Sequence, residues 1–280
     1  MPVCVVFDTH FPGRFLACPD EAAKAAILGC IDHSALELWA SLEVLEELMG
    51  VVTTRQKDQL VPLAETVLRL TKGRILALGE FLIASELRGE PHRELEAGPR
   101  DQVLAFLGQL AGGHIPSATP NIADRALQAK AEAAGQLRAL RDQAQAVFPN
   151  LGRGDLTRIT FKEVDELHWQ KKGEGFVRRY CLEYDVPDPE GTARQVVADP
   201  ARYPRVRNRM RAFSLLLHRY LVSGQRIDDG DVYDVRQMAY LNDCDVFVTD
   251  EGRFRERCME IFGGSKQIVS VSEFMSRTWC

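Results

Sequence analysis

The sequence predicts an α/β fold of three layers, in which helices cover both faces of a central parallel sheet. Short apolar runs that end in an acid occur near both ends of the 280-residue chain and alternate with helical patterns. Between them, helical periodicity dominates a long stretch. We therefore expect residues 1–54 and 225–280 to form one α/β core, interrupted by a large, mostly helical insertion over residues 55–224.

The composition bounds the class of protein. Apolar side chains make up 45% of the chain and charged ones 27%, which excludes a disordered or fibrous protein. The net charge of -5 means that any nucleic-acid contact must depend on a local basic patch. The seven cysteines form no C-x-x-C pair and no secretory leader precedes them, so we expect reduced thiols in a cytoplasmic protein without membrane contact.

The first strand is expected over residues 3–7, a β-branched apolar run that ends abruptly at Asp8. Such a run delivers an acid to the edge of a sheet. Pro12 and Gly13 then predict a loop.

A helix and a second strand follow. The helix is expected to start at Pro19 and to end near Gly29, and residues 35–40 form the strand. Ser41 is a suitable N-cap for the next helix. This alternation of strands and helices is typical of a parallel sheet.

Residues 151–224 hold the basic part of the chain, with 14 basic and 10 acidic side chains. Within it, apolar residues recur at helical spacing, so we expect a helix that buries one face. The arginines on the flanks of this helix form a positive strip, made of Arg202, Arg205, Arg207, Arg209 and Arg211. A solvated helix face is the structural alternative for the strip.

Residues 225–251 reverse this charge, with eight acids against two arginines. Asp231 and Asp234 lie three residues apart at the start of an expected helix, and thus on one face of it. The structural alternative to a functional site is that both acids only compensate the partial positive charge at the N-terminus of the helix. An apolar strand over residues 246–249 then ends at Asp250, before a helix over 253–262 and a strand over 267–271.

Two strands therefore deliver carboxylates at their carboxyl ends, namely Asp8 and Asp250. In an open parallel sheet, that edge is where binding sites form. Gathered carboxylates repel one another, and a bound cation offsets the repulsion. Because no histidine or cysteine motif accompanies these acids, Mg²⁺ or Mn²⁺ is the expected ion.

These motifs resemble those of PIN-domain ribonucleases. The resemblance is carried by Val5-Val6-Phe7-Asp8, by the acid-bearing helix after the second strand, and by the two acidic segments at residues 231–234 and 245–250. It covers roughly residues 1–52 and 225–275. It implies a metal-dependent nuclease whose acids sit at the edge of a small parallel sheet.

By position, Asp8 corresponds to the first of the site acids that PIN-domain ribonucleases share. Their second acid, which lies on a helix, corresponds to Glu47, with Glu46 as its competitor. Asp231 or Asp234, or both, correspond to the third acid. Asp250 corresponds to the last, although Glu251 stands where the family usually places it, two positions after Thr249.

The resemblance thus implies a PIN-like endoribonuclease that hydrolyses phosphodiester bonds in RNA. Asp8, Asp234 and Asp250 would hold Mg²⁺ or Mn²⁺, with Glu47 and Asp231 completing the site. The expected partner is single-stranded RNA, attracted by basic residues of the insertion; a protein inhibitor and a second copy of the chain are further partners that the family suggests. The basic residues assigned to RNA binding are Arg205, Arg207, Arg209, Arg211, Lys171 and Lys172.

Two other hypotheses compete with the nuclease. An inactive PIN-like scaffold would bind nucleic acid or protein without metal. A phosphatase of the haloacid dehalogenase type would also begin with a strand ending in aspartate. That class needs a second aspartate two residues later, where this chain has His10.

Overall fold

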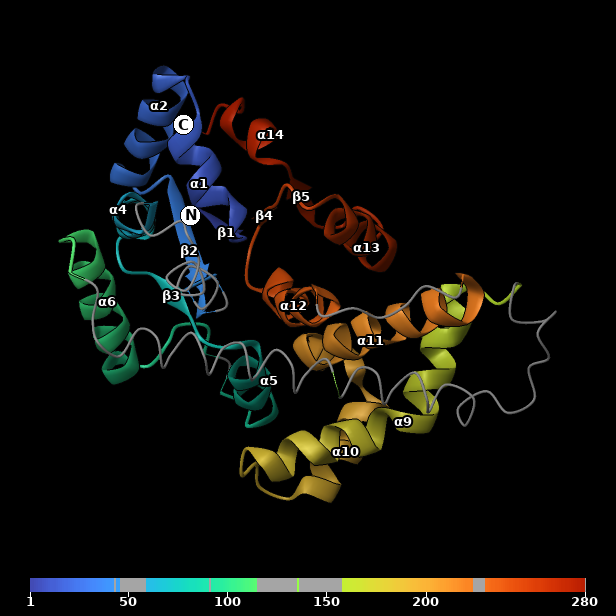
Figure 1. The fold of residues 1–280 in the computed structure, drawn as a ribbon. Coiled ribbons are helices and arrows are strands. Elements are labelled where there is room, and N and C mark those ends of the chain that lie inside the picture. Colours follow the sequence, from blue (N-terminus) through green and yellow to red (C-terminus); the bar gives the residue numbers. More distant parts are fainter. Residues whose placement is uncertain are drawn as a thin grey trace. The chain divides into compact units, whose positions relative to one another are not determined.

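The computed structural model describes residues 1–42, 44–45, 59–90, 92–114, 135, 158–223 and 230–279 (Figure 1). The chain divides into two compact units. The first unit comprises Met1–Leu78, Arg93–Gln128 and Asp243–Cys280, and the second comprises Gly79–His92 and Ala129–Asn242.

The first unit contains a sheet of five parallel strands in the order β3-β2-β1-β4-β5. The predicted α/β class with a central parallel sheet is therefore confirmed. The strands are β1 (Val3–Phe7), β2 (Leu36–Ser41), β3 (Ile75–Leu76), β4 (Val246–Val248) and β5 (Gln267–Val269). From β1 the chain builds outward first on one side, through β2 and β3, and then on the other, through β4 and β5.

Six helices belong to the described part of this unit: α1 (His10–Ala17), α2 (Glu21–Asp32), α4 (Leu60–Thr71), α6 (Ala97–Ala111), α13 (Gly252–Phe262) and α14 (Val271–Met275). Phe7 and Val248 face one side of the sheet, in one buried cluster with Phe11 of α1 and Phe274 of α14. Side chains alternate along a strand, so Phe247 faces the other side. There its ring lies 5.2 Å from that of Phe254 in α13, and helices thus pack on both faces.

The loop predicted at Pro12 and Gly13 is wrong, because both residues lie inside α1. Pro12 occupies the first turn of that helix, where a backbone N–H has no partner within the helix, so proline is tolerated there. The helix expected from Pro19 begins at Glu21 as α2, and the carboxylate of its N-cap Asp20 accepts a hydrogen bond from the N–H of Ala23. Ser41 likewise accepts one from the N–H of Val44.

Every element described in the second unit is helical. These elements are α5 (Gly79–Leu87), α9 (Phe161–Glu183), α10 (Pro189–Ala198), η3 (Pro200–Arg202), α11 (Pro204–Ser223), α12 (Gly230–Gln237) and η4 (Met238–Asn242). The basic helix that the sequence predicts is α11, and its apolar residues Val206, Met210 and Leu217 are buried as expected.

The units do not have the predicted boundaries at residues 54 and 225. Helix α4 and strand β3 belong to the first unit, because Leu63, Val67 and Leu70 of α4 enter the sheet core. Strand β3 has only two residues, too few for an alternating pattern to indicate it. Residues 230–242 belong to the second unit instead of the sheet unit.

The state of the cysteines differs from the prediction. Cys30 is disulfide-bonded, which contradicts the prediction that all seven cysteines are reduced. Free cysteines in the described residues are Cys4, Cys18, Cys181, Cys244 and Cys258.

Among the described helices, none combines the length and the apolar character needed to cross a membrane.

Candidate functional site

Strands β1 and β4 are neighbours at the point where the order of the sheet reverses, the position at which parallel sheets leave a crevice outside their carboxyl ends. Asp8 follows β1 directly and Thr249 follows β4. The N–H of Asp8 donates to the carbonyl of Val248 at 3.0 Å, which extends the pairing of the two strands to the acid itself. The sheet therefore places Asp8 beside Thr249.

Asp8 is a buried carboxylate, 3% exposed. Its Oδ2 accepts a hydrogen bond from the hydroxyl of Thr249, which is completely buried. Its Oδ1 accepts one from the backbone N–H of His10 at 3.0 Å, and the imidazole Nδ1 of His10 lies 3.6 Å from Oδ2. These contacts hold the carboxylate in a single orientation.

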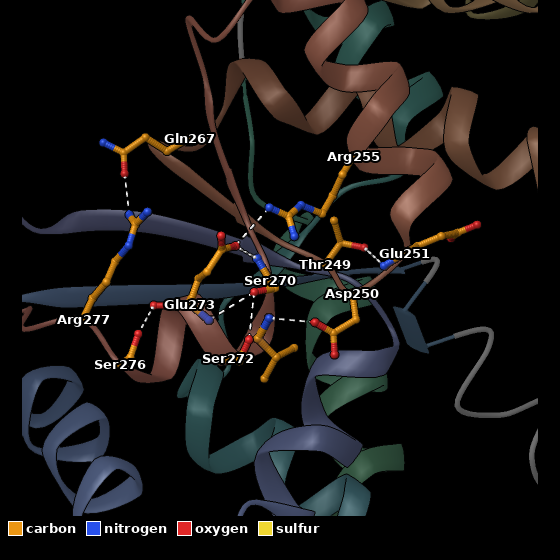
Figure 2. Close-up of polar contacts among 11 residues, drawn as sticks. Thr249, Asp250, Glu251, Arg255, Gln267, Ser270, Ser272, Glu273, Ser276 and Arg277 are labelled. Atoms are coloured by element: carbon orange, nitrogen blue, oxygen red, sulfur yellow. Dashed lines mark hydrogen bonds and ion pairs between the residues drawn. The ribbon is translucent and has the colours of Figure 1, made fainter.

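The end of β4 carries the other acids of this edge (Figure 2). Thr249 accepts a hydrogen bond from the N–H of Glu251 at 3.0 Å, so its hydroxyl links Asp8 to the following turn. The carboxylate of Asp250 accepts one from the N–H of Val271 at 2.9 Å, and its other oxygen lies 3.6 Å from Nε of Arg14.

Arg14 and His10 are site residues that sequence reasoning missed. Both belong to α1, the segment for which Pro12 and Gly13 predict a loop. In a loop, spacing says nothing about which side chains share a face. The one available signal was that His10 lies two positions after the acid.

The remaining predicted acids do not belong to the described part of the first unit. Asp231 and Asp234 lie on α12 of the second unit, three residues apart, and they are 2% and 3% exposed. Glu47 and its competitor Glu46 lie outside the described residues. Of the five predicted catalytic acids, the described residues of the first unit thus include Asp8 and Asp250, from the ends of neighbouring strands.

The donor chemistry at this edge suits a hard divalent cation. Asp8 and Asp250 supply carboxylate oxygens, the ligands that Mg²⁺ and Mn²⁺ prefer. Over the described ranges, however, no group of three or more His, Cys, Asp or Glu side chains is arranged to hold a metal ion. The donor types fit the predicted ion, whereas the described residues do not form a complete ligand set.

The predicted positive strip is wrong for two of its arginines, because Arg205 and Arg209 are buried. One guanidinium nitrogen of Arg205 donates to the carbonyl oxygens of Leu82 at 3.2 Å and His92 at 3.3 Å. Arg209 binds Glu80 at 2.8 Å. Burial by itself raises the pKa of Glu80, but Arg209 and Arg236 outweigh it and hold that pKa below its ordinary value. These arginines stabilise the second unit from inside.

The other basic residues are more accessible. Arg207 and Arg211 share the carboxylate of Asp165, and the guanidinium of Arg207 lies 4.9 Å from the ring centre of Trp169. Lys171 and Lys172 are exposed on α9. The two lysines are therefore the members of the predicted set that are placed to meet a ligand from solvent.

Comparisons of the chain with protein-family models, with curated proteins and with solved structures found no match.

Proposed function

We propose that the protein is a PIN-like endoribonuclease that hydrolyses phosphodiester bonds in RNA and requires Mg²⁺ or Mn²⁺. One observation carries the proposal: at the reversal point of a parallel sheet, a buried carboxylate at the end of one strand is oriented by a threonine at the end of the next. Burying a charged carboxylate is costly, and a protein retains such a group where it serves a purpose beyond packing.

In this proposal, Thr249 and the N–H of His10 orient Asp8, and each oxygen of Asp8 keeps a further lone pair for a ligand. Asp8 and Asp250 are the proposed metal ligands in the first unit. The resemblance to PIN-domain ribonucleases proposes Asp234 as a further ligand, with Glu47 and Asp231 as supporting acids. A bound divalent ion would supply an activated water and neutralise charge on the leaving oxygen.

Contact with the RNA backbone is assigned to Lys171 and Lys172, with Arg207 and Arg211 as neighbours already paired to Asp165. Exposed lysines release counterions from a polyanion and so supply affinity that does not depend on sequence.

A metal-free scaffold is the second candidate. The competition between Glu46 and Glu47, and between Asp250 and Glu251, leaves it open. The ion pair of Asp250 with Arg14 favours it, because that pairing neutralises the acid without a metal. Calorimetric titration with Mn²⁺ separates the two functions. The nuclease requires Mn²⁺ binding that disappears in Asp8→Asn, whereas a scaffold shows no such difference.

The activity test uses the purified full chain and a fluorescent single-stranded RNA. We expect cleavage with Mn²⁺, none with EDTA, and a loss of at least 100-fold in Asp8→Asn and in Asp250→Asn. Asp101→Asn is the matched control, because it removes the same charge from an exposed side chain of α6. Cleavage by Asp8→Asn at the rate of the control would overturn the proposal. Asp231→Asn and Asp234→Asn then decide which of the two acids takes part.

A further inference from the structure

A pocket of about 440 Å³ opens beside Asp250 in the first unit. Binding sites for small molecules commonly have volumes of roughly 300–1,000 Å³. The end of α1, the start of α2, and α14 form its walls. The lining residues are Arg14, Ala17, Cys18, Asp20, Ala23, Asp250, Val271, Ser272, Met275 and Ser276.

Much of the lining is apolar and small. Ala17 and Ala23 line the pocket where longer side chains would fill it, and Val271 and Met275 of α14 add apolar surface. The pocket therefore suits a flat ring with apolar faces.

Two carboxylates lie among these apolar groups, and they are already oriented. Asp20 uses one oxygen to accept the N–H of Ala23, and Asp250 uses one to accept the N–H of Val271, each at 2.9 Å. The second oxygen of Asp20 can accept hydrogen bonds from a ligand, whereas the second oxygen of Asp250 already faces Nε of Arg14 and can accept a further one beside it. An ionised carboxylate only accepts, so the ligand must present N–H or O–H donors.

Arg14 adds a positive group at the rim. Its side chain is 68% exposed, and its Nε lies 3.6 Å from the carboxylate of Asp250. A guanidinium group in that setting can donate to a phosphate, with which arginine forms paired hydrogen bonds.

We infer that this pocket binds a guanine nucleotide of the RNA substrate, next to the bond that is cut; the inference rests on the proposed function, because Asp250 belongs to both. Guanine presents two adjacent donors, N1–H and the N2 amino group, which one carboxylate can accept together, because an oxygen that already accepts a backbone N–H keeps a second lone pair. Uracil presents a single N–H between two carbonyl acceptors, which carboxylates repel. RNA-binding proteins commonly read unstacked bases through these edges.

The binding test uses guanosine 5′-monophosphate and calorimetry on the full chain. Ala17→Trp fills the pocket from an exposed position at the end of α1, and we expect it to weaken binding at least tenfold. Leu16→Trp is the matched control, since Leu16 is exposed on the same helix but does not line the pocket. The affinity of Leu16→Trp for guanosine 5′-monophosphate should stay within twofold of that of the original chain. Uridine 5′-monophosphate should bind at least tenfold more weakly.

Two conservative variants test the polar groups without filling the pocket. Asp20→Asn keeps a good helix cap but replaces one acceptor by an amide, and it should reduce the preference for guanine over uracil. Arg14→Gln should weaken binding of the monophosphate more than binding of guanosine. Equal affinities across the original chain and all these variants would overturn the inference.

Cys18 offers a measurement independent of affinity. It lines the pocket and is half-buried, whereas Cys4, Cys181, Cys244 and Cys258 are buried. Saturating guanosine 5′-monophosphate should slow alkylation of Cys18, located by mass spectrometry, and should do so less in Ala17→Trp. Unchanged alkylation with bound nucleotide would contradict the assignment of the pocket.

Assays of RNA cleavage distinguish a failure of this inference from a failure of the proposed function. If the chain cuts RNA but Ala17→Trp keeps the same base preference and rate, the pocket assignment fails and the nuclease stands. If the chain binds guanosine 5′-monophosphate in the pocket but leaves RNA intact with Mn²⁺, the nuclease fails and the nucleotide site stands.

Discussion

The hydroxyl of Thr249 donates a hydrogen bond to the carboxylate of Asp8, joining the ends of two strands that are 241 positions apart in the chain. Both side chains are buried, and the same hydroxyl accepts the N–H of Glu251. One small side chain therefore links the orientation of the acid at the end of β1 to the path of the turn that carries Asp250.

Thr249→Val removes this hydroxyl while keeping the shape of the side chain. Because a buried carboxylate and a backbone N–H are both left without this partner, we expect the free energy of unfolding to fall by about 1–3 kcal/mol. RNA cleavage should fall as well, since Asp8 is no longer held in place. Urea unfolding and cleavage rates measure the two effects.

Thr249→Ser is the control for that substitution, because it keeps the hydroxyl and removes only a methyl group. It should retain more of the stability and of the activity than Thr249→Val. Equal losses in both variants would show that packing of the methyl group, and not the hydrogen bond, matters at this position.

Lys171 and Lys172 are expected to contribute to RNA affinity without contributing to the fold. Changing both to alanine should weaken binding of single-stranded RNA and reduce the slope of log affinity against log salt by about 0.7 for each phosphate group that a lysine no longer neutralises. Because both side chains are exposed, stability should change by no more than about 0.5 kcal/mol. A salt slope equal to that of the original chain would remove the lysines from the interface.

Arg205→Ala is the corresponding variant at a buried residue of the predicted positive strip, in contrast to the two exposed lysines. Its buried guanidinium donates to the carbonyl oxygens of Leu82 and His92, so its removal should lower the free energy of unfolding by more than about 2 kcal/mol. If the variant has normal stability and binds RNA more weakly, Arg205 belongs to the RNA-binding surface instead.

His168 should make stability depend on pH. Burial lowers the pKa of His168 to about 4, an effect that nearby Lys172 and Arg207 reinforce and Asp165 opposes. Between about pH 6.5 and 4 the unfolded chain binds a proton at this residue and the folded chain does not, so stability falls as the pH falls through that window. The loss amounts to about 3 kcal/mol at most.

His168→Asn is the variant that tests this dependence, because its amide can still reach the hydroxyl of Ser214, which lies 3.0 Å from Nδ1 of His168. Asparagine does not titrate. Urea unfolding of both proteins at pH 7.5, 6, 5 and 4.5 should show a stability difference that shifts in favour of the variant as the pH falls. A difference that is constant over this range would contradict the prediction.

Elements with strong local signals could be predicted from the sequence. The β-branched run of β1, the acid after it, the cap at Ser41 and the apolar spacing of α11 all appear in the structure where the pattern indicates them. Where two local signals conflict, prediction failed. Pro12 and Gly13 indicate a break, but Phe11 and Phe15 on the same segment are buried in the sheet core, and that burial stabilises α1 as a helix.

The sequence by itself determined which chemical groups are present and which local elements carry them: an acid at the end of each of two apolar strands, and a basic helix with one apolar face. Only the tertiary structure decided which of those groups remain accessible. Arg205 and Lys171 are both basic residues on helices, yet one is buried against carbonyl oxygens of another segment and the other is exposed. The same holds for Thr249, whose partner is brought to it by strand pairing alone. Local pattern depends on neighbours along the chain, whereas burial and hydrogen bonding depend on neighbours in space.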